Sequence, residues 1–383
     1  MTAPAEPVIE TQFLHLPGPF RLRSGAELPE VTLAYETYGA LSPAKDNAVL
    51  VFHAMTGSQH AHGFNPAVPT VGELWNDECR QGWWDAFIGP GRAIDTDKYF
   101  VICANYLGGC YGTTGPRSID PRTGTPYGSR FPSVRVEDFV DSQVRLLDHL
   151  GIGTLRAAIG ASIGGMMALS LATLYPGRCR IVIPIGSGME VTVLQRIINF
   201  EQARAIESDP NFHGGDYYDG DPPNSGLALA RMIAHKTFVS LEGLEERSRG
   251  DGIRDFPETG WFRIGHPIES YMLHQGRKFV SRFDANTYLR ILEAWQRFDL
   301  LKPCGATNPV ELFSRCREQH YLLFTIDSDV AFYPQEQERL ASALRDAAVR
   351  QMRITVHSLK GHDSFLLEPE FYRPHIAHAL EAW

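Results

Sequence analysis

The chain has 383 residues, of which 43% are hydrophobic and 21% are charged, as is usual for a globular protein. Its formal net charge of -9 argues against a nucleic-acid-binding protein, which needs a basic face. The N-terminal sequence lacks the basic and apolar regions of a signal peptide, and no apolar run approaches the roughly 18 residues of a membrane span. The six cysteines form no CxxC pair, which is typical of reduced thiols. We therefore expect a cytoplasmic protein without nucleic-acid or membrane partners.

Short apolar runs with the length of buried strands follow one another along the chain. They occupy residues 31–38, 48–54, 98–105, 155–160, 180–185, 321–326 and 353–358. Several lack polar alternation, which is typical of strands buried on both faces of a parallel sheet. Helical periodicity appears at 135–150 and 163–175. This alternation of strand and helix predicts an α/β fold with a doubly wound, mostly parallel sheet.

The alternation stops between residues 190 and 312. Four helices are expected there, at 191–207, 225–240, 266–282 and 285–297. An independent helical domain would fit this pattern too. We favour a helical lid inserted into a core domain formed by residues 1–189 and 313–383, because the two strands after residue 320 have no other sheet to join.

A candidate nucleophile stands where a predicted strand meets a predicted helix. The sequence there reads Gly160-Ala161-Ser162-Ile163-Gly164, the G-x-S-x-G pattern of a nucleophile elbow. The strained turn that exposes the serine requires small neighbours. A packing role is the alternative, because 35 glycines make a chance match unsurprising. The strand–helix junction favours the nucleophile.

A serine nucleophile needs a general base and a carboxylate, which follow it in this fold in the order Ser, acid, His. His362 lies in a loop after the last predicted strand, where it would take the Ser162 proton. Asp327 and Asp329 both follow the strand at 321–326. The spacing does not choose between these two acids, one of which would serve the turn itself.

An acyl intermediate also needs donors for its oxyanion. One candidate is the backbone N–H of Ile163, directly after the serine. The second is the N–H of Met55, just past the strand at 48–54. A core role for the Met55 side chain is compatible with this, because only its backbone would be used.

Longer motifs give the chain a family resemblance over about residues 12 to 380. These are FHAMTGSQHAHG (52–63), GWWDAFIGPGRAIDTDKYFVICANYLGGCYGTTGP (82–116), GASIGGMMAL (160–169), GLALARMIAHKTF (226–238), ESYMLHQGRKFVSRFDANTYL (269–289), DSDVAFYP (327–334) and GHDSFLLE (361–368). With them the chain resembles the homoserine O-acetyltransferase family, a transferase branch of the α/β-hydrolase fold.

The resemblance implies roles for several residues. It makes Ser162 the nucleophile, His362 the base and Asp329 the orienting acid. It also places Arg231 and Asp363 around the amino-acid acceptor, with Thr56 near the same pocket. A guanidinium grips an α-carboxylate and a carboxylate pairs with an α-ammonium, although a surface salt bridge and an ordinary loop acid are the plain alternatives.

The same resemblance implies the reaction and its partners. Acetyl-CoA would donate an acetyl group through an acyl-serine to the hydroxyl of L-homoserine, a step of methionine biosynthesis, with no bound cofactor or metal. The family suggests a homodimer formed through the lid helices. A narrow passage under the lid would exclude water from the acyl-enzyme.

Two departures leave the substrates open. The elbow has Ala161 and Ile163 where the family often has Gly and Met, which is conservative. Phe238 stands where the family usually has a tyrosine that reaches the acceptor, so a serine acceptor fits the sequence too. A succinyl donor and a carboxylesterase activity also stay open. The intact Ser162, Asp329 and His362 argue against a non-catalytic relative.

Three further signals are given less weight. His53, His60 and His62 lie close together, but no Glu or Cys completes a metal-ligand set at the usual spacing. The glycines of residues 105–116 lack a phosphate-loop ending and are expected to shape the pocket floor. The aromatic cluster of Trp83, Trp84 and Phe87 is expected in the core or against the lid rather than on a ligand.

Overall fold

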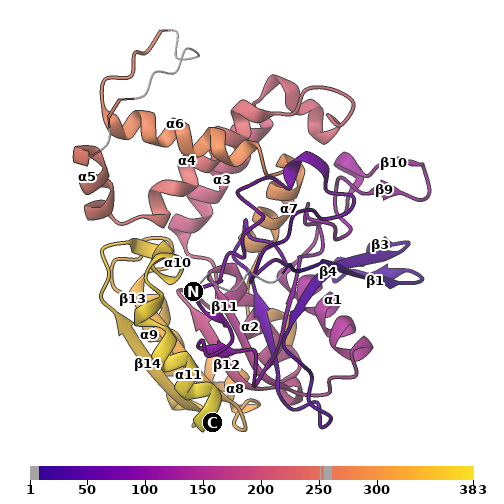
Figure 1. The fold of residues 1–383 in the computed structure, drawn as a ribbon, viewed down its shortest axis with the longest axis vertical. Helices are drawn as coiled ribbons and strands as arrows, with labels where there is room; N and C mark the ends of the chain where they lie inside the picture. The colour runs from indigo at the N-terminus through magenta and orange to yellow at the C-terminus, as the bar shows by residue number, and fades with distance from the viewer. Residues whose placement is uncertain (1–7, 251, 254–260) are drawn as a thin grey trace, which may run out of the picture.

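An eight-stranded sheet runs through the molecule, with strands in the order β1-β4-β8-β5-β11-β12-β13-β14 (Figure 1). The structure, a computed structural model, describes residues 8–250, 252–253 and 261–383. Strands from β8 to β14 pair in parallel, whereas β1 and β4 form an antiparallel edge. The bounds are β1 Gln12–Leu16, β4 Val31–Tyr38, β5 Ala48–Phe52, β8 Phe100–Ala104, β11 Leu155–Ala161, β12 Cys179–Ile185, β13 His320–Ile326 and β14 Arg350–Val356. The predicted mostly parallel α/β sheet is confirmed.

Helices flank and extend this sheet. They are α1 Val136–His149, α2 Ile163–Leu174, α3 Val193–Glu207, α4 Asn224–Phe238, α5 Leu241–Gly250, α6 Pro267–Val280, α7 Ala285–Gln296, α8 Pro309–Ser314, α9 Pro334–Asp346, α10 Ser364–Leu367 and α11 Arg373–Ala382. Short two-stranded ribbons pair β2 Phe20–Arg21 with β3 Glu27–Leu28, β6 Ile88–Gly89 with β7 Ile94–Asp95, and β9 Ile119–Asp120 with β10 Thr125–Pro126. Each helix predicted from periodicity is present. The structure adds elements that were not predicted, namely β1, the short ribbon strands, α5 and α8 to α11.

Both faces of the central strands are buried, as the uninterrupted apolar runs predict, whereas the edge strand β14 is largely exposed. Alternate residues of β5 point to opposite faces: Leu50 and Phe52 join the hydrophobic cluster that contains α1 and α2. Val49 and Val51 join the cluster that contains α11. This packing fixes the carboxyl end of β5 and thereby the point at which the following loop begins, after residue 52.

The helices α3 to α7 lie between β12 and β13 in the chain, and α3 to α6 stand at one end of the molecule above α10 (Figure 1). Thr192 begins α3 with a capping box that Gln195 completes. Helix α4 contacts both α3 and α6. The expected boundary at residue 312 falls inside α8. The division of the chain into a core and a lid stays a prediction. Among the described residues, no helix has the length and apolar character to cross a membrane.

Candidate active site

Ser162 sits on a sharp turn between β11 and α2. Its backbone adopts φ 59° and ψ −127°, a left-handed conformation that non-glycine residues rarely adopt and that commonly marks a functional site. The Ser162 N–H donates to the carbonyl of Ile185 over 2.9 Å. Its own carbonyl accepts from the Ser187 hydroxyl over 2.8 Å. The neighbouring strand β12 therefore holds the strained turn in place.

The glycines around Ser162 serve packing. A Cβ at Gly160 would overlap the carbonyl oxygen of Gly164, and one at Gly164 would overlap the carbonyl oxygen of Phe52. A Cβ at Gly165 would meet the Ser187 side chain. The small residues therefore serve two purposes. They let the backbone pack closely around the turn, and they let the turn form that presents the Ser162 side chain to the cavity.

His362 and Asp329 form a buried pair beside this turn. His362 Nδ1 lies 2.7 Å from Asp329 Oδ2, and the exposed fractions of the two side chains are 4% and 0%. Asp329 Oδ1 accepts from the backbone N–H groups of Ala331 and Phe332, each over 2.8 Å. Because the carboxylate accepts, the imidazole hydrogen sits on Nδ1 and Nε2 is free to accept. His362 Nε2 is buried and has no hydrogen-bond partner among the described residues.

The other candidate acid has different partners. Asp327 Oδ2 lies 2.8 Å from Nδ1 of the exposed His357, and Asp327 Oδ1 accepts from the Ser358 N–H over 3.1 Å. Asp327 thus links the turn after β13 to the segment after β14, and Asp329 is the acid in contact with His362.

The environment of His362 changes its basicity. Burial alone would lower the pKa of His362, but the charge and hydrogen bond of Asp329, with a smaller contribution from Asp363, raise the pKa above its usual value. A raised pKa makes the His362 imidazole a stronger base, which favours its accepting a proton from a reacting group.

A cavity of about 200 Å³ connects these residues. Ser162 and His362 line it from the core, Met55 and Thr56 from the loop after β5, and Arg231 and Asp363 from α4 and the start of α10. Ile163 begins α2, so its N–H is at the positive end of that helix. In the described part of the chain, neither the Met55 nor the Ile163 N–H donates to a backbone carbonyl. The structure therefore brings every predicted site residue to one place.

Arg231 has a poorly solvated charge in this cavity. Burial and the nearby charge of Arg282 lower the pKa of Arg231, while Asp363 opposes that shift. Its Cζ lies 5.2 Å from the ring centroid of Phe238 and 5.0 Å from that of Phe279. Arg231 makes no ion pair within 4.0 Å in the part of the chain that the structure describes. A guanidinium between aromatic rings without a close carboxylate suits an anionic ligand.

Asp363 complements this cation. Burial raises the pKa of Asp363, whereas His362 and Arg231 oppose the rise. It lines the cavity together with Arg231, so opposite charges flank the approach to Ser162. The Phe238 ring centroid lies 6.2 Å from that of His362, which places an apolar ring where a phenol would offer a hydroxyl.

Sequence reasoning missed part of the wall. Arg282, Tyr111 and Trp83 also line the cavity. Arg282 Nη1 donates to the Thr56 carbonyl over 3.0 Å and lies 3.3 Å from the Tyr111 hydroxyl. Trp83 was expected in the core or against the lid, but it borders the cavity because its Nε1–H donates to the Ser58 carbonyl over 3.0 Å. A resemblance motif covers each of the three, but no spacing rule marks them.

The other signals have structural explanations. Trp84 and Phe87 are buried core residues. Of the glycine-rich segment 105–116, only Tyr111 appears on the cavity wall, so its glycines do not form the expected floor. They allow close backbone packing instead, as at Gly109, where a Cβ would overlap the Asn105 side chain.

The three clustered histidines have separate partners. His60 Nδ1 lies 2.7 Å from Glu36 Oε2, and His62 Nδ1 lies 2.5 Å from Asp85 Oδ1. The His53 ring stacks on a tyrosine at 3.7 Å, and burial lowers the pKa of His53 to about 4. These imidazoles are therefore held by protein groups.

Comparison with known proteins agrees with this geometry. The α/β hydrolase fold family model matches residues 47–369, so the fold and the site define an α/β-hydrolase. Esterase E22 superposes with a TM-score of 0.86 at 28% identity, over 97% of this chain and 100% of that one. The homoserine O-acetyltransferase of Bacillus anthracis has a TM-score of 0.87 at 24% identity, over 98% of each chain, and shows the shared fold.

Sequence relatives narrow the class. The homoserine O-acetyltransferase of Deferribacter desulfuricans is 41% identical over 94% of this chain and 92% of its own. The homoserine O-acetyltransferase of Rhodospirillum rubrum is 41% identical over 97% of this chain and 93% of its own. The homoserine O-succinyltransferase of Cellvibrio japonicus is 42% identical over 96% and 95%. The chain belongs to the homoserine O-acetyltransferase family and is an enzyme.

Proposed function

We propose that the protein transfers an acyl group from acyl-CoA, foremost acetyl-CoA, to the hydroxyl of L-homoserine, a step in methionine biosynthesis. The observation that carries this proposal is the position of Arg231 and Asp363 on the wall of the cavity that contains Ser162. A simple esterase has no need for opposite charges at that place, whereas an amino acid offers a carboxylate and an ammonium to them.

The first half-reaction acylates the enzyme. Ser162 Oγ attacks the thioester carbonyl while His362 Nε2 takes its proton, and Asp329 stabilises the imidazolium. The N–H groups of Met55 and Ile163 stabilise the oxyanion. The intermediate collapses, the C–S bond breaks, and the CoA thiolate leaves with the proton from His362.

The second half-reaction transfers the acyl group. Arg231 binds the α-carboxylate of homoserine and Asp363 its α-ammonium, with Thr56 beside them. His362 removes the proton of the side-chain hydroxyl, whose oxygen attacks the acyl carbonyl. The bond to Ser162 Oγ breaks and the serine recovers a proton from His362, which completes a ping-pong cycle.

The inserted helices supply the protection from water that this chemistry needs. Residues 190–312 contribute Arg231, Phe238, Arg282 and Trp295 to the cavity wall. We assign them the role of a lid that holds the acceptor and restricts water at the acyl-serine. The position of the cavity between α4 and the core supports this role.

An acceptor-by-donor matrix tests the proposal. Homoserine and serine are each assayed with acetyl-CoA and succinyl-CoA, in the wild type and in Phe238→Tyr. We expect the highest kcat/KM for homoserine with acetyl-CoA, and a lower KM for homoserine in Phe238→Tyr because one hydrogen bond is gained. Use of serine alone would refute the proposed acceptor. CoA release that is independent of any amino acid would favour the esterase.

Succinyl transfer is the second candidate. The Cellvibrio japonicus relative, named a homoserine O-succinyltransferase, is as similar in sequence as the acetyltransferases. A higher kcat/KM for succinyl-CoA in the same matrix would select it.

We also propose a homodimer formed through the lid helices. Helix α3 exposes Val193, Leu194, Ile197 and Phe200 on its surface, and residues three and four apart share one helix face. A second copy of this chain is the occupant that the family suggests. Light scattering would show a dimer, and Ile197→Asp with Phe200→Asp would shift it to monomer, whereas a wild-type monomer would refute this interface.

The cytoplasm is the proposed location. The substrates are an acyl-CoA and an amino acid, which the cell's interior supplies. All six cysteines are free thiols, as is common in a reducing compartment.

A further inference from the structure

The segment from Met55 to His62 borders the cavity without forming a helix or strand. Gln59, His60 and Ala61 are each at most 1% exposed. A buried segment outside regular structure must find partners for its backbone groups among side chains. Those partners determine where the segment lies.

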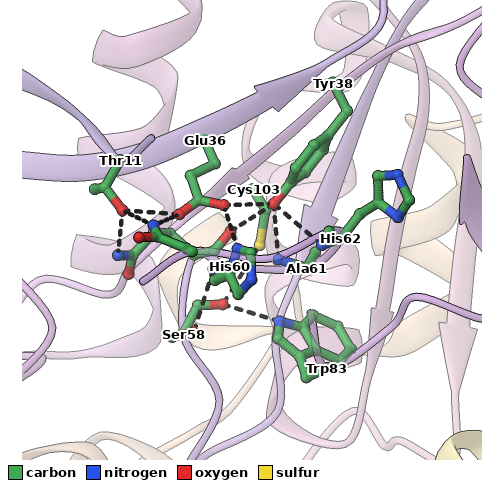
Figure 2. Close-up of polar contacts among 12 residues, drawn as sticks. Thr11, Glu36, Tyr38, Ser58, His60, Ala61, His62, Trp83 and Cys103 are labelled. Atoms are coloured by element: carbon green, nitrogen blue, oxygen red, sulfur yellow. Dashed lines mark hydrogen bonds and ion pairs between the residues drawn. The ribbon is translucent and has the colours of Figure 1, made fainter. Parts of the chain in front are cut away.

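Tyr38 is one of these partners (Figure 2). Its Oη accepts from the Ala61 N–H over 2.8 Å and from the His62 N–H over 3.3 Å. The closer acceptor for the single hydroxyl hydrogen of Tyr38 is Glu36 Oε2 at 2.8 Å, and the Gln59 carbonyl lies 3.3 Å away. One phenol on β4 therefore ties two backbone amides of the loop to a carboxylate.

Glu36 is the centre of this network. Its Oε1 accepts from the Thr11 hydroxyl over 2.7 Å and from Asn65 Nδ2 over 2.8 Å. Its Oε2 contacts Tyr38 and His60 Nδ1, the latter at 2.7 Å (Figure 2). The side chains of Glu36 and His60 are both completely inaccessible to solvent. A buried carboxylate with this complement of donors is fully satisfied.

The hydrogen bonds of His60 fix its hydrogens. Nε2 lies 2.9 Å from the carbonyl oxygen of Arg80, which only accepts, so Nε2 carries a hydrogen. A second hydrogen must then lie between Nδ1 and Glu36 Oε2, because two lone pairs at 2.7 Å would repel. The pair is therefore neutral overall, and His60 has no free nitrogen with which to act as a base.

We propose that the network of Glu36, His60 and Tyr38 positions the Met55 N–H for the oxyanion. It fixes the loop on the side after Met55, while Arg282 holds the Thr56 carbonyl from the lid side. Gly57 packs closely against His53, since a Cβ added there would lie 2.9 Å from the His53 Cβ. Glu36, His60 and Tyr38 are positioning residues, and their role rests on the proposed acylation of Ser162.

The test measures acylation of Ser162 by p-nitrophenyl acetate, which requires neither CoA nor homoserine. In His60→Gln the amide cannot replace both imidazole hydrogen bonds, which join Glu36 and the Arg80 carbonyl. Tyr38→Phe removes the hydroxyl oxygen and leaves the Ala61 and His62 N–H groups without their acceptor. We expect each to slow the saturating burst rate, His60→Gln by about 10- to 100-fold, because a small displacement of a transition-state donor is costly. His62→Gln, which changes a neighbouring pair with Asp85, is the matched control and keeps the wild-type rate.

The rate and the amplitude of the burst distinguish a positioning role from a purely structural role in folding. A purely structural role would lower the burst amplitude, which counts folded active sites, and leave the rate per site unchanged. Should His60→Gln fail to fold, Tyr38→Phe decides. Wild-type burst rates in the folded variants would overturn the proposal. A wild-type burst without any transfer from acyl-CoA would instead refute the proposed function and leave the positioning measurement valid.

Discussion

Two buried imidazole–carboxylate pairs border the same cavity and have the same 2.7 Å contact. His362 pairs with Asp329, and His60 pairs with Glu36. The difference lies in the remaining nitrogen: Nε2 of His362 has no partner in the described residues, whereas Nε2 of His60 lies 2.9 Å from a carbonyl oxygen. Burial and charge partner are alike in the two pairs. Only His362 therefore has a ring nitrogen free to exchange a proton with the proposed nucleophile Ser162, which lines the same cavity.

The two pairs also differ in what they support. Asp329 is held by backbone N–H groups after β13 and orients a single ring. Glu36 collects donors from β4 and from three loop residues, and so holds a segment of the chain. We therefore propose that the same chemical pair serves proton transfer in one place and loop geometry in the other.

The largest expected effect separates the two histidines directly. His362→Gln removes the proposed general base, and we expect kcat for acyl transfer to fall by about 10⁴-fold. His60→Gln is expected to cost far less, since its nitrogens take no proton from substrate. Steady-state CoA release with homoserine measures both. Equal losses would contradict the comparison.

The carboxylates provide a sharper version of the same contrast. In Asp329→Asn the amide oxygen keeps the two backbone donors, so the NH₂ group faces His362 Nδ1 and forces the hydrogen onto Nε2. That tautomer cannot accept from Ser162, and we expect kcat to fall by about 10³-fold.

The matched substitution at the other pair is Glu36→Gln. It also places the imidazole hydrogen on Nε2, here of His60, but we expect little loss of activity. In Glu36→Gln the amide oxygen keeps Thr11 and Asn65, so the NH₂ group faces His60 Nδ1 and leaves the hydrogen on Nε2. The NH₂ group also faces Tyr38 Oη, whose hydrogen then turns to the Gln59 carbonyl, 3.3 Å away. The Arg80 carbonyl already requires the His60 hydrogen on Nε2, and we expect kcat within about 3-fold of wild type. A loss as large as that of Asp329→Asn would show that the charge of Glu36, and not its hydrogen bonds, is needed.

A smaller effect is expected at the acceptor site. Arg231→Lys keeps the charge and loses the planar fork, so KM for homoserine should rise about 10-fold with kcat little changed. The burst with p-nitrophenyl acetate, which lacks an amino-acid acceptor, is the control and should be unaffected. A fall in that burst rate would place Arg231 in the acylation step.

The smallest effect concerns pH. The active form of His362 is neutral, so activity is present above its pKa and is lost as the pH falls through it. Because this pKa is raised, the acidic limb of the acylation rate should lie above the ordinary histidine value of about 6.5. Asp363→Asn removes one of the raising charges and should move the limb to lower pH. A shift to higher pH would contradict this assignment.

Sequence patterns predicted the fold well, because buried parallel strands have strong local signals. The elbow pattern and the order of Ser162, acid and histidine marked the candidate site, whose catalytic role stays a prediction. The choice between Asp327 and Asp329 required either the family pattern or the backbone donors seen in the structure. Arg282 was missed because its contact with the Thr56 carbonyl depends on how the segment after α6 meets the loop after β5. Glu36 was missed because its partners come from segments far apart in the chain, which leave no periodic trace.

Trapping of the acyl-enzyme tests the central claim most directly. The protein is mixed with acetyl-CoA without acceptor, and the intact mass and digested peptides are measured before and after homoserine is added. The account predicts one acetyl group on Ser162, none on Ser162→Ala, and rapid discharge to O-acetylhomoserine. Release of CoA without acetylated Ser162, or an acetyl-serine that homoserine discharges no faster than water does, would contradict it.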